Sequence, residues 1–210
     1  MRRLWFIAAA ILGCERPASV PGRWTRPAVV FLGDSLTEGQ GVRSDESYPS
    51  LLERRMKAAG IDLPVVNAGV SGDTTDGALS RLERIAAFPV SVLVVAVGVN
   101  DAVRFRPPAE IRSNLTRIIE RGRSIGARVV LAGMKLPPSF PEEYRRSFEN
   151  IYPELAERYR MPLVPFLLEG VAGDPALTRR DGLHPNAQGY RRVADVIWPV
   201  IEPVLRSASR

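Results

Sequence analysis

Five short apolar runs, separated by longer stretches with helical periodicity, constrain the fold of this chain more than any other feature. Each run is rich in β-branched residues and is apolar at nearly every position. Continuous runs of this kind are typical of parallel strands that are covered on both faces. We expect strands at residues 28–33, 64–69, 91–98, 127–134 and 161–166.

The stretches between these runs carry apolar residues three and four positions apart, as amphipathic helices do. Ile111 and Ile118 belong to one such stripe, with Pro108 before it and Gly126 after it as helix start and stop signals. Strands that alternate with helices, joined by right-handed crossovers, predict an α/β fold. We therefore expect a three-layer, doubly wound sandwich with a five-stranded parallel sheet.

The composition is typical of one globular domain and does not indicate a nucleic-acid partner. The chain has 210 residues, of which 45% are hydrophobic and 25% charged, and its formal net charge is +6. Lys57 and Lys135 are the only lysines, and the arginines are scattered along the chain. Because a nucleic-acid binder usually concentrates its positive charge on one face, we interpret these arginines as a solvated surface.

The first residues form a separate compositional unit. Two arginines precede an apolar stretch at 4–12, which is too short to span a bilayer and is typical of a signal peptide. We expect a signal peptide at 1–13 and a linker rich in proline and arginine at 14–27. Cys14, the single cysteine, either carries lipid after cleavage or is inert, and we favour lipidation. These features predict an exported protein, either periplasmic or membrane-anchored as a lipoprotein.

Polar residues follow several of the predicted strands. Ser35 comes after the first strand, Gly72 after the second and Asn100 after the third, and His184 lies shortly before the last helix. Ligands of doubly wound sheets bind beyond the carboxyl ends of the strands. We therefore expect these four residues to converge at one edge of the sheet.

These residue types suit serine-dependent ester hydrolysis, which needs a nucleophile, a base, a group that orients the base, and donors for the oxyanion. Ser35 is the candidate nucleophile, and His184, the single histidine, is the candidate base. Asp181, three residues earlier, is placed to orient the imidazole. Backbone N–H groups of Ser35 and Gly72 and the amide of Asn100 are candidate oxyanion donors.

Taken singly, each residue has an ordinary structural interpretation. A serine after a strand commonly caps a helix, and a glycine such as Gly72 commonly forms a turn. Asn100 or Asp101 can cap the following segment, and His184 can be a loop residue. Their joint occurrence at successive strand ends favours the catalytic interpretation.

In these four blocks the sequence resembles the SGNH branch of the GDSL esterase and lipase family. The matching residues are Ser35 in "GDSLTEG", Gly72 in "GVSGDT", Asn100 in "GVND" and His184 in "DGLHP". The third block departs slightly from the family's pattern, because Val99 stands where a second glycine is common. The likeness extends over residues 28–205, which we take as the hydrolase domain, with a short tail at 206–210.

This resemblance implies a flavodoxin-like sandwich and a serine hydrolase mechanism without metal or other cofactor. It implies activity on aryl esters, short-to-medium acyl esters and lysophospholipids, and on acyl thioesters. We expect a monomer with a small-molecule or lipid ester as its partner, attached to the membrane if Cys14 carries lipid. The loops after the third and fourth strands are expected to wall the substrate pocket with Val103, Phe105, Leu136, Pro138 and Phe140. Carbohydrate O-deacetylation and a non-catalytic surface lipoprotein are the alternatives.

Overall fold

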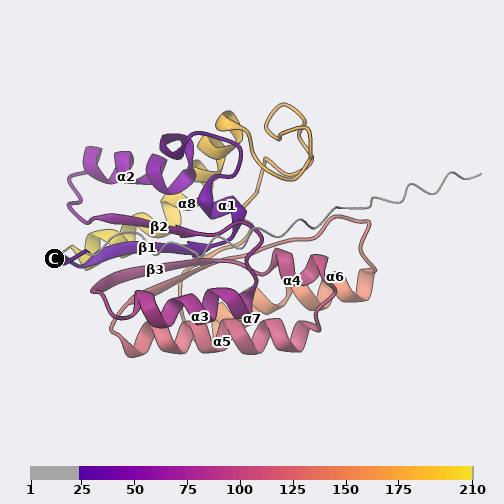
Figure 1. The fold of residues 1–210 in the computed structure, drawn as a ribbon, viewed down its shortest axis with the longest axis horizontal. Coiled ribbons are helices and arrows are strands. Elements are labelled where there is room, and N and C mark those ends of the chain that lie inside the picture. The colour runs from indigo at the N-terminus through magenta and orange to yellow at the C-terminus, as the bar shows by residue number, and fades with distance from the viewer. Residues whose placement is uncertain (1–23, 210) are drawn as a thin grey trace, which may run out of the picture.

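The computed structural model describes residues 24–209, which form a parallel sheet of five strands with helices on both faces (Figure 1). The strands are β1 (Ala28–Gly33), β2 (Val65–Gly69), β3 (Val90–Ala96), β4 (Arg128–Ala132) and β5 (Leu163–Val164). Their order across the sheet is β2-β1-β3-β4-β5, which is the order of flavodoxin-like folds. The predicted three-layer sandwich is therefore confirmed.

The central strand β1 explains why its sequence is apolar throughout. All six of its residues are buried, because it pairs in parallel with β2 on one side and β3 on the other and is covered above and below. Phe31 pairs with Asn67 of β2 and with Val94 of β3. A strand in this position has no face turned to water, so a polar residue at every second position would be buried without a partner.

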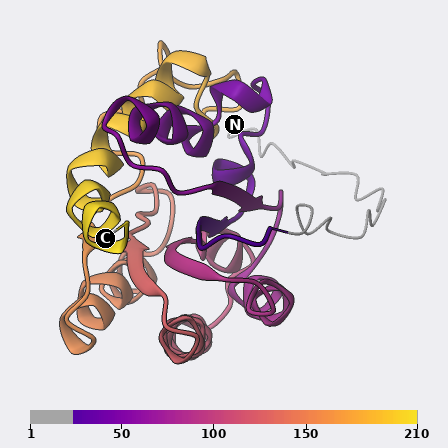
Figure 2. The same ribbon diagram turned by 90° about the vertical axis from the view of Figure 1, so that its left-hand side faces the viewer.

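Two groups of helices cover the sheet, one on each face (Figure 2). The helices are α1 (Ser35–Glu38), α2 (Tyr48–Ala58), α3 (Thr75–Ile85), α4 (Val99–Val103), α5 (Pro108–Ser124), α6 (Glu142–Glu149), α7 (Ile151–Arg158) and α8 (Ala187–Ala208), with a 3₁₀ helix, η1, at Ser44–Glu46. On one face α2 packs against α8, and on the other α3 packs against α5, which also contacts α7. Both layers therefore rest on the central strands.

Helix α5 shows how the apolar stripe becomes the core. It begins at Pro108, as the proline signal predicts, and Ile111, Leu115 and Ile118 on its inner face are fully buried. Gly122 lets the helix approach the sheet closely, since a Cβ there would lie 2.8 Å from Cδ2 of Leu93. The period of the apolar residues thus fixes which face of the helix meets the sheet.

Two elements differ in extent from the ranges expected from the sequence. Strand β5 has only two residues, shorter than the apolar run at 161–166, and α8 continues to Ala208, past the expected end of the domain at 205. The end of the expected linker packs on the domain: the indole N–H of Trp24 donates to the carbonyl of Pro89 at 2.8 Å. Residues 1–13 and Cys14 lie outside the described residues. Between Trp24 and Ser209, no helix is both long and apolar enough to cross a membrane.

Candidate active site

The turn after β1 places Ser35 at the carboxyl edge of the sheet. The strand ends at Gly33, and Asp34 caps α1 by accepting a hydrogen bond from the N–H of Leu36 at 3.0 Å. Ser35 is therefore the first residue of the helix, and the cap is its neighbour. Because the cap bond is made by Asp34, the Ser35 hydroxyl is free to contact another side chain.

The loop before α8 carries Asp181 and His184 and is fixed by backbone contacts. Thr178 and Pro185 form an isolated antiparallel bridge, and the N–H of Arg179 donates to the carbonyl of His184 at 2.8 Å. Asn186 then caps α8 with its side chain. The loop is thus closed at its base, which limits the positions that the His184 ring can take.

The three side chains of the predicted triad form one chain of hydrogen bonds. Oγ of Ser35 lies 2.9 Å from Nε2 of His184, and Nδ1 of His184 lies 3.0 Å from Oδ2 of Asp181. The other carboxylate oxygen of Asp181 accepts from the N–H groups of His184 and Leu183, each at 2.9 Å. The imidazole therefore stands between the serine and the carboxylate, 149 residues from the serine in sequence.

The charge of Asp181 selects between the two tautomers of the His184 ring. Burial raises the pKa of Asp181, but hydrogen bonds from the N–H groups of His184 and Leu183 and from the imidazole outweigh it, and the pKa is lowered to about 2. An ionised Asp181 accepts a proton donor at Nδ1 of His184. The imidazole tautomer that carries its proton on Nδ1 has the lone pair of Nε2 facing Ser35, which is the arrangement that a general base needs.

The structure brings the four predicted blocks together. Ser35, Gly72, Asn100 and His184 line one pocket of about 180 Å³. Gly72 has a φ of 77°, a left-handed conformation that favours glycine. The side-chain amide of Asn100 donates to the carbonyl of Asp73 at 2.9 Å, which holds this side chain at the pocket. The pocket therefore combines a nucleophile, a base and candidate donors for an oxyanion.

Two carboxyl groups that neighbour Asn100, the fully buried Asp34 and the partly buried Asp73, were not found by sequence reasoning. Burial raises the pKa of Asp34 to about 7, with the charge of Asp73 adding to this effect. Burial also raises the pKa of Asp73, although Arg81 opposes the shift. Oδ2 of Asp34 lies 3.4 Å from the amide nitrogen of Asn100. The signal that could have found Asp34 is its position between a strand and a helix, where an aspartate commonly caps the helix.

Asp101 joins two elements beside the site. Its carboxylate accepts from the N–H and the hydroxyl of Thr75, both at 2.8 Å, and it is fully buried. These bonds tie α4 to the first turn of α3. The cap of α4 is Gly98, so neither Asn100 nor Asp101 takes the capping role considered for them.

A second, larger pocket adjoins the first. It has a volume of about 490 Å³, and Leu136, Pro138, Phe166 and Leu168 form much of its apolar wall. Leu183, next to His184 in sequence, lines both pockets. Two of the five predicted wall residues, Leu136 and Pro138, therefore lie in this second pocket and not in the pocket of Ser35.

The other three predicted wall residues do not lie on one surface. Val103 lines the pocket of Ser35. Phe105 and Phe140 are not among the residues that line either pocket; their rings lie 5.4 Å apart and both neighbour Tyr144. Phe105 is 60% exposed and has a φ of 51°. Val103 ends α4, whereas Phe105 and Phe140 lie in the loops after α4 and β4, where their rings meet each other.

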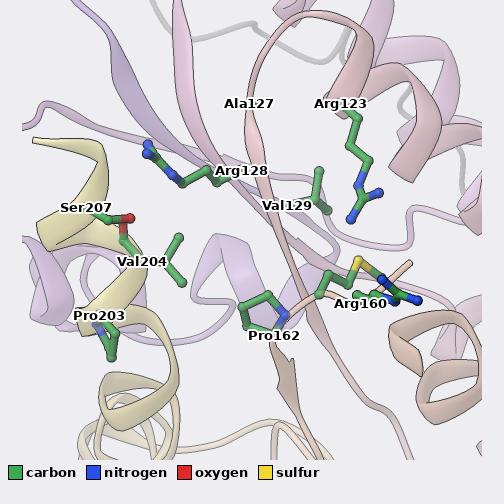
Figure 3. Close-up of a pocket in the computed structure, with 10 residues that line it drawn as sticks. Arg123, Ala127, Arg128, Val129, Arg160, Pro162, Pro203, Val204 and Ser207 are labelled. Carbon is green, nitrogen blue, oxygen red and sulfur yellow. The ribbon is translucent and has the colours of Figure 1, made fainter. Parts of the chain in front are cut away.

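A third hollow lies at the opposite edge of the sheet, where β4 and β5 begin (Figure 3). Its volume is about 430 Å³, and Arg123, Arg128 and Arg160 line it. The guanidinium groups of Arg123 and Arg128 point in different directions in this view. Arg123 lies in the last turn of α5, where a cation is favoured by the helix dipole. No predicted site residue lines this hollow.

Comparison with known proteins identifies the family. The model of the GDSL-like Lipase/Acylhydrolase family matches residues 31–192. Esterase TesA of Pseudomonas aeruginosa is 34% identical over 199 residues, which cover 94% of this chain and 99% of that protein. The crystal structure of TesA has a TM-score of 0.81 at 34% identity, covering 84% of this chain and 99% of that chain.

Two further relatives carry names that describe their activities. An arylesterase of Vibrio mimicus is 36% identical over 170 residues, covering 80% of this chain and 85% of that protein. Thioesterase 1/protease 1/lysophospholipase L1 of Escherichia coli is 30% identical over 182 residues, covering 86% of each. The sheet order, the shared pocket and these relatives agree: the chain belongs to the GDSL-like lipase and acylhydrolase family of SGNH serine hydrolases.

Proposed function

We propose that this protein hydrolyses carboxylic esters through an acyl-enzyme on Ser35. The observation that carries the proposal is the unbroken chain of contacts from Ser35 to His184 at 2.9 Å and from His184 to Asp181 at 3.0 Å. This geometry is the recurring arrangement of serine hydrolases, in which a base within hydrogen-bond reach activates the hydroxyl.

In the first half of the reaction, Oγ of Ser35 attacks the ester carbonyl carbon while Nε2 of His184 takes the hydroxyl proton. The tetrahedral intermediate collapses, and the bond to the alcohol breaks as His184 returns the proton to the leaving oxygen. In the second half, His184 deprotonates a water that attacks the acyl carbon. The second tetrahedral intermediate collapses, and the bond to Oγ of Ser35 breaks as His184 returns the proton to that oxygen and the carboxylic acid leaves. Asp181 stabilises the imidazolium that forms in each half.

The negative charge of each tetrahedral intermediate requires donors on the opposite side of the pocket from His184. The N–H groups of Ser35 and Gly72 and the amide of Asn100 are the groups that we assign to this role. Gly72 and Asn100 line the same pocket as Ser35, which supports the assignment. Donors of this kind stabilise the transition state more than the substrate, because the oxygen gains charge only there.

For the substrate we propose aryl esters, short-to-medium acyl esters and lysophospholipids, with acyl thioesters as further substrates. The apolar pocket of about 490 Å³ beside the catalytic pocket is large enough for an acyl chain, and Leu183 connects the two. The names of the relatives, an arylesterase and a thioesterase and lysophospholipase, support the same substrate class.

A substrate panel tests this proposal. Rates are measured for p-nitrophenyl esters of increasing acyl length, acyl thioesters, lysophospholipids and acetylated sugars, with Ser35→Ala as the matched control. We expect hydrolysis that extends beyond acetyl esters and vanishes in the control. Strict preference for acetylated sugars would instead identify a carbohydrate O-deacetylase. An intact protein that a fluorophosphonate probe never labels at Ser35 would be a non-catalytic binding protein.

We also propose that the protein is exported, anchored through lipid on Cys14, and monomeric. The support for export and lipid is compositional: an apolar stretch at 4–12 follows two arginines and ends shortly before the single cysteine. Mass analysis of the mature N-terminus distinguishes the outcomes. A diacylated Cys14 supports anchoring, cleavage at another site supports export alone, and an intact Met1 contradicts both. Light scattering of the purified protein tests the monomer.

A further inference from the structure

Arg81 of α3 is a buried cation with no assigned role. It is 7% exposed, and its guanidinium is surrounded by acceptors. Nη1 donates to the carbonyl of Ala68 at 2.8 Å, Nη2 donates to the carbonyl of Gly33 at 3.1 Å, and both Nε and Nη2 donate to Oδ2 of Asp73, at 2.9 and 2.5 Å. Enclosing a charged side chain this well has a desolvation cost, which its contacts must offset.

The acceptors of Arg81 belong to three separate segments that meet at the site. Gly33 ends β1 and stands two residues before Ser35, and Ala68 is in the last two residues of β2. Asp73 directly follows Gly72 in the loop after β2. The guanidinium of Arg81 therefore joins β1, which leads to the nucleophile Ser35, to the loop that carries the candidate oxyanion donor Gly72. Its rigid fork of donors fixes their relative positions in a way that a flexible ammonium does not.

Asp73 extends this connection to Asn100. The backbone carbonyl of Asp73 accepts the side-chain amide of Asn100 at 2.9 Å, while its carboxylate holds Arg81. Gly77 makes room for that carboxylate, since a Cβ there would lie 1.9 Å from Oδ1 of Asp73. The contact path thus runs from Arg81 through Asp73 to both candidate donors, Gly72 beside it in sequence and Asn100 across the pocket.

We infer that Arg81 is a positioning residue for the oxyanion donors: it sets Gly72 and Asn100 relative to Ser35 by bonding Gly33, Ala68 and Asp73 at once. The inference rests on the proposed esterase function. It predicts a defect in the chemical step, because misplaced donors stabilise the transition state less while substrate binding is retained. A residue that only stabilises the fold would lower the unfolding temperature and leave kcat of the folded enzyme unchanged.

The test compares Arg81→Lys with Arg84→Lys, the same substitution at an exposed site on the same helix. Lysine keeps the charge beside Asp73 but lacks the fork that reaches two carbonyls. We expect Arg81→Lys to lower kcat for a p-nitrophenyl ester by about tenfold and to leave KM within about threefold of the wild-type value. This loss in kcat is smaller than the loss that removal of an oxyanion donor itself causes. Arg84→Lys is expected to match the wild type. A kcat of Arg81→Lys within about twofold of this control overturns the inference.

A double-mutant cycle with Asn100→Ala separates positioning from general weakening. If Arg81 acts through the donors, Arg81→Lys costs less when Asn100 is already absent, about threefold or below. The same tenfold loss in both backgrounds overturns the inference. If Arg81→Lys does not fold, Asp73→Asn interrupts the same contact from its other side, and an unchanged kcat in that variant likewise overturns it. Failure of the wild type to hydrolyse any ester or to react with a fluorophosphonate would instead defeat the proposed function.

Discussion

His184 is held at both of its ring nitrogens, and its two partners impose different requirements. Ser35 needs a proton acceptor at Nε2, whereas Asp181 needs a proton donor at Nδ1. One neutral tautomer satisfies both. Because the chain contains a single histidine, no other imidazole can take its place.

His184→Ala is therefore expected to remove nearly all esterase activity while the protein stays folded. The side chain is only 12% exposed, but it belongs to the loop before α8 and not to the hydrophobic core, so the loss falls on the chemical step, by a factor of about 10⁶ in kcat. Steady-state rates with a p-nitrophenyl ester and circular dichroism of the same samples check both statements. Retained activity in a folded variant would show that another base serves Ser35.

Asp181→Ala is expected to cost less than His184→Ala. The imidazole remains beside Ser35, but it loses the partner that selects its tautomer and stabilises its charge, which typically costs on the order of 10⁴ in kcat in related triads. The variant also loses the acceptor of two loop N–H groups, so KM is expected to change with kcat. Equal rates for Asp181→Ala and wild type would remove Asp181 from the mechanism.

The residues that line the candidate catalytic pocket were predictable from the sequence, but Arg81, which contacts the segments that carry them, was not. Ser35, Gly72, Asn100 and His184 each follow a strand or precede the last helix, and topology alone brings such positions together. Arg81 gives no such signal, because in the sequence it is one arginine among many in an amphipathic helix. Its role depends on three carbonyl and carboxylate acceptors whose positions exist only in the folded molecule.

At the scale of elements, the site depends on how closely α1 approaches β2. A Cβ on Gly69, the last residue of β2, would lie 2.1 Å from the backbone nitrogen of Glu38 in α1. The close contact involves backbone atoms, which cannot rotate away as a side chain can. The short helix that begins with Ser35 is thus seated directly on the end of a neighbouring strand.

Gly69→Ala is expected to displace α1 and to lower both stability and activity. Overpacking of this kind costs about 1–3 kcal/mol in the free energy of unfolding, and any movement of α1 moves Ser35 away from His184. Gly60→Ala is the control: its φ of 72° carries backbone strain of about 1 kcal/mol, but its Cβ would meet nothing within 4 Å. Urea unfolding and kcat are measured for both. A Gly69→Ala variant as active as Gly60→Ala would contradict the packing argument.

Element types were predictable because each has a distinct period, whereas their ends were not. The first run, at 28–33, has the bounds of β1, since Asp34 stops the strand with a capping bond that sequence also signals. The run at 161–166 yields only two strand residues. Its strand pairs only with β4, and Pro162 and Pro165 flank the paired part without an N–H to donate.

At the scale of the whole molecule, a buried carboxyl group links stability to pH. Burial raises the pKa of Asp34 to about 7 and also raises the pKa of Asp73. Between about pH 4 and 7 the folded protein therefore binds more protons than the unfolded chain, and stability falls as the pH rises. Asp181 acts oppositely: its lowered pKa contributes stability that is lost only as the pH falls below about 4.

Asp34→Asn is expected to flatten the decline of stability between about pH 4 and 7, because the variant has no proton to lose there. The free energy of unfolding in urea is measured at intervals across this range. Asp76→Asn makes the same substitution at an exposed aspartate in the first turn of α3 and serves as the control. A slope in Asp34→Asn equal to that of the wild type would show that Asp34 is not the group responsible.

The parallel topology has a consequence for biosynthesis. Ser35 is made early and His184 late, and the imidazole is held at a loop whose closing helix, α8, is the last element of the chain. A chain that stops before His184 has a nucleophile without its base. Esterase activity is therefore expected only after residues 181–184 have been made and the loop that carries them has closed against Ser35.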